Sequence, residues 1–158
     1  MSPGDREIKI NVFSIFKEVL SSSQNGNIKY KNLQSSNVRN ELIKYWSDSI
    51  KNSRNINKTQ KDIFNLYKER CAKSIKNIQN YEELIQYFSN KEYEGCIIDL
   101  EILSKVYELN IIILDKDKRI QNNNIKYNII KNKNSVYYIC IYRSKIQTKN
   151  VYNIILFH

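Results

Sequence analysis

The stretch Tyr93–Leu114, YEGCIIDLEILSKVYELNIIIL, places a turn, an amphipathic helix and a short strand in direct succession. Gly95 is one of three glycines in the chain and favours a turn or a helix entry. Apolar residues then recur at helical spacing as far as Asn110, where we expect the helix to end. The continuous apolar run Ile111–Leu114 predicts a strand covered on both faces, and Asp115–Lys118 would follow it as a solvated turn.

The other expected elements are helices first and strands afterwards. Helical periodicity predicts helices over 12–20, 38–50, about 59–78 and 81–88, the second capped by Ser35 or Ser36 and the fourth by Asn80. Strands are expected at Ile125–Ile130, Val136–Tyr142 and Val151–Phe157, while Glu7–Ile10 is too short to assign. This order predicts one α+β domain over residues 1–158, in which Leu103 and Ile112 are almost fully buried.

The composition indicates a globular chain without a membrane partner. Of its residues 41% are hydrophobic, no apolar run approaches the roughly 20 residues of a membrane helix, and the first residues form no secretory signal. Cys71, Cys96 and Cys140 are odd in number and widely spaced, so we expect free thiols in a cytoplasmic setting and no structural zinc. Cys71 and Cys140 lie on apolar faces and predict core packing, whereas Cys96 lies beside Gly95 at a helix entry. We expect neither a metal nor a cofactor.

Positive charge is concentrated towards the C-terminal end. The net charge is +10, and Lys118–His158 contains eight basic residues and no acid, namely Lys118, Arg119, Lys126, Lys131, Lys133, Arg143, Lys145 and Lys149. This one-sided distribution favours an anionic partner, and we expect these residues to share one face that contacts RNA. The alternative is an ordinary solvated surface of strands and loops. Tyrosines interleave with the cations and can stack bases, although strand packing accounts for most of them.

The opening stretch resembles the C-terminal half of ovarian-tumour (OTU) domains, papain-like cysteine proteases that cleave ubiquitin. The features that carry the resemblance are Gly95-Cys96, Asp99, Leu100, Leu103 and the strand motif Leu109-Asn110-Ile111-Ile112-Ile113. The helix Tyr81–Phe88 is similar to the family's helix that leads into the turn. Val151-Tyr152-Asn153 is similar to the start of its last strand, which opens with His-Tyr-Asn or His-Phe-Asp. The resemblance implies a small mixed β-sheet packed between helices.

The family's catalytic cysteine and histidine are both missing from this chain. A papain-like site needs a thiolate at a helix N-terminus and a histidine as its base. The family's cysteine aligns with Asn11 or, after a shift of one residue, with Val12. Its histidine aligns with Val151, and Asn153 keeps the rest of the motif. The terminal His158 would lie about 23 Å away along a regular strand at roughly 3.3 Å per residue. We therefore expect these positions to be degenerate and the chain to have no peptidase activity.

Three functions compete. The first is an inactive OTU-like domain kept as a binding or scaffold module. The second is binding to RNA or a ribonucleoprotein such as the ribosome through the basic C-terminal half, and one molecule could combine both. The third is an active OTU-type deubiquitinase with a displaced nucleophile. Ubiquitin is the weaker partner, because its own recognition face is basic and this chain carries a net charge of +10.

Overall fold

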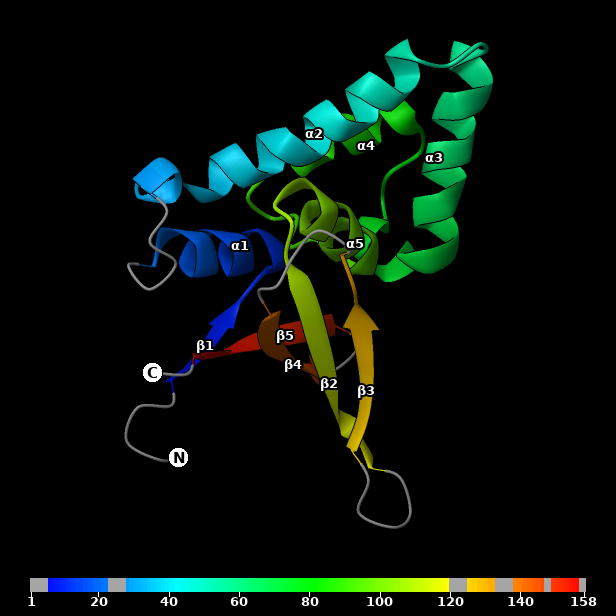
Figure 1. Ribbon diagram of the computed structural model, residues 1–158. Helices are drawn as coiled ribbons and strands as arrows, with labels where there is room; N and C mark the ends of the chain where they lie inside the picture. Colours follow the sequence, from blue (N-terminus) through cyan, green and yellow to red (C-terminus); the bar gives the residue numbers. More distant parts are fainter. Residues whose placement is uncertain (1–5, 23–27, 120–124, 133–137, 147–148, 157–158) are drawn as a thin grey trace.

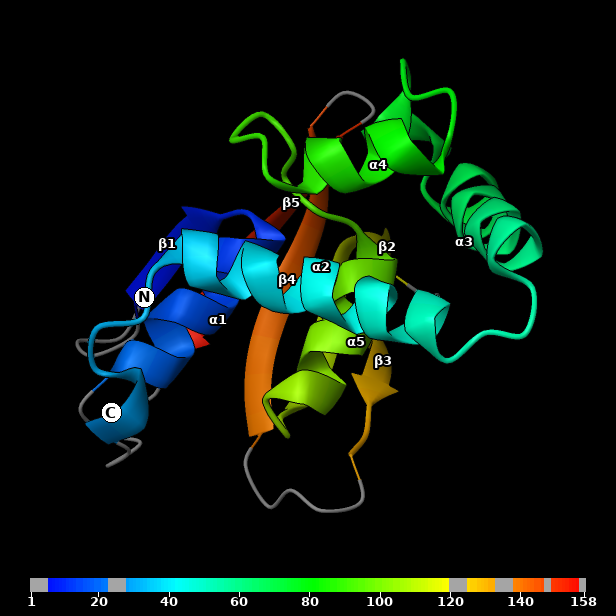
Figure 2. The ribbon, with the colours of Figure 1, turned by 90° about the horizontal axis from the view of Figure 1, so that it is seen from above.

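The computed structural model describes residues 6–22, 28–119, 125–132, 138–146 and 149–156. Within these ranges the backbone alone is described for residues 6–10, 28, 115–119, 125–127, 138, 142–146 and 149–156. The helices form a layer on one side of a twisted sheet (Figures 1 and 2). The chain therefore has the predicted α+β architecture.

The sheet is mixed and brings the two ends of the chain together. Its strand order is β1-β5-β4-β2-β3, with β1 at Arg6–Ile10, β2 at Asn110–Arg119, β3 at Ile125–Ile130, β4 at Tyr138–Ile146 and β5 at Lys149–Leu156. β2 and β4 run parallel, and the other neighbours are antiparallel. The first strand, which the sequence alone did not assign, pairs with the last, so that Ile8 lies opposite Ile154.

Helix α1 spans Val12–Ser21 and follows β1 without a connecting loop. Asn11 makes this sharp junction: its backbone is still extended, and its side chain accepts a hydrogen bond from the Ser14 N–H at 2.9 Å. Such N-caps satisfy donors that a helix start leaves unpaired. The apolar face of α1 is buried in the core and comprises Val12, Phe13, Ile15, Phe16, Val19 and Leu20.

The next helical elements are the 3-10 turn η2 (Ile28–Tyr30), α2 (Ser35–Lys51), α3 (Ile56–Arg70), the 3-10 turn η3 (Ala72–Ile75) and α4 (Tyr81–Phe88). α2 is capped by Gln34 rather than by a serine, because the Gln34 N–H donates to Asn37 Oδ1 at 2.9 Å. Asn55 caps α3 and starts it three residues earlier than expected, and η3 replaces its predicted last turns. Asn80 caps α4 as predicted.

Helix α5 (Ile97–Val106) lies at the centre of the helical layer. Its buried residues occur on nearly all sides: Ile98, Asp99, Leu100, Ile102, Leu103 and Ser104. The prediction that Leu103 is almost fully buried is confirmed, since it is 0% exposed. The helix ends at Val106 rather than at Asn110, because Glu108 adopts a positive φ of 55° that stops it.

Strand β2 is internal to the sheet but is not equally covered on its two faces. Ile111 and Ile113 are buried, whereas Ile112 and Leu114 are half-buried. The expectations that both faces are covered and that Ile112 is almost fully buried are therefore wrong. The reason is the period of two along a strand, which directs alternate side chains away from the helices.

The strand boundaries differ from the expected ones at β2, β4 and β5. β2 continues to Arg119, where a solvated turn was expected, and its register with β3 shifts between Leu114 and Arg119. The start of β4 is two residues later than expected, and the start of β5 is two residues earlier. β3 has the predicted bounds.

Candidate functional site

The N-terminus of α1 is the position at which the resemblance places a catalytic cysteine. Here Asn11 Oδ1 is occupied by the Ser14 N–H, and the Val12 N–H donates to the Glu94 carbonyl at 3.0 Å. The Val12 side chain is 0% exposed. Neither Asn11 nor Val12 therefore presents a thiol or a hydroxyl, and the backbone N–H groups of Val12 and Ser14 are used within the protein.

The start of β5 lies beside this helix start. β1 and β5 pair with Ile10 opposite Tyr152 and Lys9 opposite Asn153, so the next position along each strand is Asn11 and Val151. The backbone thus brings together the two positions that align with a catalytic dyad. Only the backbone of Val151 and Asn153 is described, and His158 lies outside the described residues.

Gly95 closes the site from the α5 side. It has a φ of +87°, and a Cβ added there would lie 2.6 Å from Val12 Cβ and 2.9 Å from Val12 Cγ2. A side chain at residue 95 would therefore need strained backbone and would collide with α1. Of the turn or helix entry predicted at Gly95, the helix entry is confirmed, since the next residue, Cys96, is the N-cap of α5. Gly95 lets the α4–α5 connection pack directly on Val12.

A buried carboxylate lies just beyond this turn. Asp99 is 0% exposed and accepts hydrogen bonds from Tyr67 Oη at 2.5 Å, from Tyr93 Oη, and from the Cys96 N–H at 3.0 Å. Burial raises the pKa of Asp99 to about 6, although the three donors oppose the shift. Burial, together with the Asp99 charge, also raises the pKa of both tyrosines well above the usual range, so they remain donors.

Arg39 of α2 binds the backbone of the connection between α4 and α5. Its Nη1 donates to the Phe88 and Asn90 carbonyls, both at 2.9 Å, and its Nη2 donates to the Tyr93 carbonyl at 2.7 Å. The guanidinium also lies 4.1 Å from the centre of the Phe13 ring, a cation–π contact. Because every one of these partners is internal, Arg39 and Asp99 form a structural network rather than an exposed reactive site.

This network was missed at the level of sequence. Asp99 lies in the first turn of α5, and its bond to the Cys96 N–H is that of a capping box. Its complete burial carries no local signal, because the two tyrosines that bind it come from α3 and from the loop before α5.

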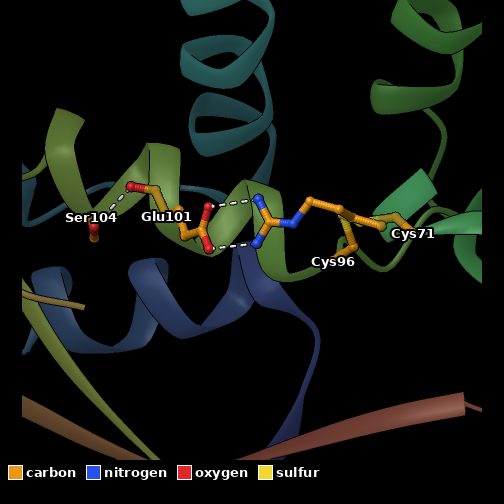
Figure 3. A network of polar contacts seen from close by, with 5 residues as sticks. Cys71, Cys96, Glu101 and Ser104 are labelled. Carbon is orange, nitrogen blue, oxygen red and sulfur yellow. Dashed lines mark hydrogen bonds and ion pairs between the residues drawn. A yellow bond between two sulfur atoms is a disulfide. The ribbon is translucent and has the colours of Figure 1, made fainter. Parts of the chain in front are cut away.

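Cys71 and Cys96 form a disulfide, with Cα atoms 6.2 Å apart, so the expectation of free thiols is wrong for this pair. Cys71 is the residue that ends α3, and Cys96 is the N-cap of α5. Wide sequence spacing concealed the pairing, because it depends on how α3 packs beside α5. Figure 3 shows the disulfide near Glu101, whose carboxylate pairs with the Arg70 guanidinium at 2.7 and 3.0 Å. Cys140 is unbonded and half-buried.

The eight basic residues of the C-terminal segment lie mostly outside the described side chains. Lys131 is exposed just after β3, and Lys133 is outside the described residues. The backbone places Lys118 and Arg119 on β2, Lys126 on β3, Arg143 and Lys145 on β4, and Lys149 on β5. Whether they share one face therefore stays a prediction.

The described residues contain no group of His, Cys, Asp and Glu side chains that could hold a metal ion. The same residues contain no helix that combines the length and the apolar character of a membrane span.

No family model matches the chain, and no curated protein matches it in sequence. Two solved structures are similar to its fold. One is the OTU domain of OTUD1, with a TM-score of 0.46 and 11% identity over 95% of this chain and 85% of that one. The other is the viral OTU domain protease from Dera Ghazi Khan virus, with a TM-score of 0.49 and 12% identity over 96% of this chain and 80% of that one. Both contain OTU domains, the family that the sequence resembles.

Proposed function

We propose that this chain is a catalytically inactive OTU-like domain that serves as a binding module. The observation that carries the proposal is the start of α1. Val12 is fully buried there against Gly95, and the Asn11 side chain caps α1. A papain-like mechanism needs a thiolate at such a helix start. Of the three cysteines, Cys71 and Cys96 are bonded to each other. Burial raises the pKa of Cys140, which keeps its thiol protonated and a poor nucleophile.

An activity-based ubiquitin probe with a thiol-reactive end group tests the inactivity. We expect no covalent adduct and no hydrolysis of ubiquitin conjugates, with and without a reductant that opens the disulfide. A stable adduct on any of the three cysteines would instead support a deubiquitinase with a displaced nucleophile. The Cys140→Ala variant shows whether an adduct lies on the unbonded thiol, and an adduct there without hydrolysis of ubiquitin conjugates by the wild type would be nonspecific alkylation.

The partner we propose is RNA, alone or within a ribonucleoprotein such as the ribosome. The support is the charge of the chain: a net +10, and a segment after Asp117 with eight cations and no acid. Lysine and arginine that neutralise phosphates release counterions, and the gain in free energy grows with the number of contacts. Contacts of this kind position a protein on RNA without reading its bases.

Filter binding to structured RNA at several salt concentrations tests the partner. The affinity should fall with salt, with a log–log slope of about one per phosphate contact. Reversing Lys131, Lys133, Lys145 and Lys149 to Glu should abolish binding. The matched control reverses four exposed lysines of α3 and the turn after η3, namely Lys58, Lys61, Lys68 and Lys76, and so changes the net charge equally. Equal losses in the two variants, or no affinity of the wild type at low salt, would reject the C-terminal segment as the RNA contact.

A further inference from the structure

A pocket of about 410 Å³ lies away from the start of α1, between η2, the first half of α2 and the end of α5. Its walls include the polar residues Lys29, Asn32, Asn37 and Glu41 and the aromatic residues Tyr30 and Tyr107. The volume lies within the roughly 300–1,000 Å³ of sites that hold small ligands or single groups of larger ones. None of these residues belongs to the helix start described above.

Tyr107 lines this pocket, and its hydroxyl makes no hydrogen bond within the protein. Its hydroxyl is the one buried side-chain polar atom of the described residues that has no hydrogen-bond partner in the protein. Burial, with the Glu41 carboxylate and Tyr30 nearby, raises the pKa of Tyr107 well above its usual range, so the group stays a hydroxyl. A buried donor without an acceptor is costly, which makes an acceptor from outside the chain favourable.

Glu41 supplies the complementary chemistry. Its side chain is half-buried, and within the described residues its carboxylate has neither a hydrogen bond nor an ion pair. An ionised carboxylate has two oxygens and can accept two parallel N–H donors. The lining thus combines one protonated phenol, whose hydroxyl is closed to water in this structure, with one two-pronged acceptor.

The aromatic walls are held in place by the core. The Tyr107 ring stacks on Phe16 with centroids 5.7 Å apart, and it meets the Tyr30 ring edge-on, also at 5.7 Å. The Lys29 ammonium lies 5.5 Å from the centre of the Tyr30 ring, in exposed surroundings. A flat ring could therefore rest against aromatic surface here, with a cation beside it for an attached phosphate.

We propose that this pocket receives an unpaired guanine base of single-stranded RNA. Guanine has two adjacent donors on one edge, N1–H and the N2 amino group, which match the two oxygens of Glu41. In adenine and cytosine an acceptor nitrogen lies beside the amino donor and would face the carboxylate. Uracil has a single N–H between two carbonyl oxygens. The guanine acceptors O6 and N7 suit the Tyr107 hydroxyl. The inference rests on the proposed RNA function and adds a base preference to it.

Titration with the four ribonucleoside 5′-monophosphates, followed by NMR of the backbone amides, tests the pocket by itself. GMP should bind most tightly and should shift the signals of residues 30–41 and 106–107. Glu41→Gln should weaken GMP binding by about 5- to 160-fold, the value of a bidentate contact. Tyr107→Phe should weaken it by about 2- to 13-fold and should still fold, since it removes an unpartnered hydroxyl.

The matched controls remove the same functional groups, a carboxylate and a phenol hydroxyl, from positions outside the pocket. Asp48→Asn removes an exposed carboxylate from the same helix, and Tyr81→Phe removes a phenol hydroxyl from α4; both should bind GMP like the wild type. GMP binding that is no tighter than AMP, CMP or UMP binding, or that is unchanged in Glu41→Gln, would overturn the guanine site. RNA binding that survives in Glu41→Gln but disappears when the C-terminal lysines are reversed would overturn the pocket and leave the proposed function intact. Absence of all RNA binding would remove the function, whatever the GMP titration shows.

Discussion

Opening the Cys71–Cys96 disulfide should destabilise this protein substantially. The two cysteines are 25 residues apart in sequence, and the bridge ties the end of α3 to the start of α5. In the chain-entropy description, a cross-link over a loop of that length removes about 12 cal/mol/K of entropy from the unfolded chain, or about 3.5 kcal/mol at 25 °C. The adjacent Arg70–Glu101 pair cannot replace the bridge, because both side chains are 38% exposed and such pairs contribute less than about 1 kcal/mol.

Thermal unfolding with and without a phosphine reductant measures this loss. For a chain of this size about 1 kcal/mol corresponds to about 2–4 °C, so reduction should lower Tm by about 7–14 °C. The Cys71→Ala/Cys96→Ala variant should show a similarly low Tm that no longer responds to the reductant. Cys140→Ala is the control, since this cysteine is unbonded and its variant should respond to reduction like the wild type.

Titration of reactive thiols in the unfolded protein distinguishes a covalent disulfide from two cysteines that only lie close together. The chain has three cysteines, so the unfolded, unreduced protein should expose one reactive thiol and the reduced protein three. Three reactive thiols before reduction would show that the bridge does not form. A Tm that reduction leaves unchanged would refute the argument that the bridge stabilises the protein by lowering the entropy of the unfolded chain.

Two further predictions concern the turn and the carboxylate beside the disulfide. Gly95→Ala should destabilise the fold by about 2–5 kcal/mol, because it combines a left-handed backbone with a Cβ 2.6 Å from Val12 Cβ. A free energy of unfolding from urea titration within about 0.5 kcal/mol of the wild type would contradict that packing. Since the pKa of Asp99 is raised from 3.8 to about 6, the native state binds the extra proton between these values, and stability should fall as pH rises through this window, by about 3 kcal/mol in total. Asp99→Asn should lose this part of the pH dependence, and equal slopes for the two proteins between pH 4 and 6 would show that the carboxyl titrates normally.

The elements that could be predicted from the sequence are those whose signals are local. Asn80 before an amphipathic run specifies the start of α4, and the spacing of apolar residues specifies α1 and α5. β3 has its predicted bounds for the same reason. Periodicity and caps need no knowledge of what packs against them, and the order of these elements was enough for the α+β class.

The features that escaped prediction depend on contacts between distant residues. Ile112 looked like the middle of a strand covered on both faces, but the helices cover only the face of Ile111 and Ile113. The disulfide and the bonds of Tyr67 to Asp99 join segments more than twenty residues apart. The pocket lined by Tyr107 depends on where α5 ends. The sequence predicted Tyr107 inside this helix, whereas the structure has it as the C-cap.

Under the proposed function, the start of α1 illustrates how a fold and a reaction can be separated. On the proposed alignment, the nucleophile would occupy the residue that begins or precedes α1, and a nucleophile must be reachable by substrate. Val12 is instead fully buried, and Gly95 approaches it so closely that no Cβ fits between them. Active-site geometry generally costs stability, whereas an apolar side chain packed in the same place contributes to it. The junction of β1 and α1, the Gly95 turn and the start of β5 can therefore persist as parts of the core, because their packing does not require the chemistry. Restoring a thiol by Val12→Cys alone should accordingly give no protease, since the sulfur would be buried under Gly95 and Val151 would offer no base.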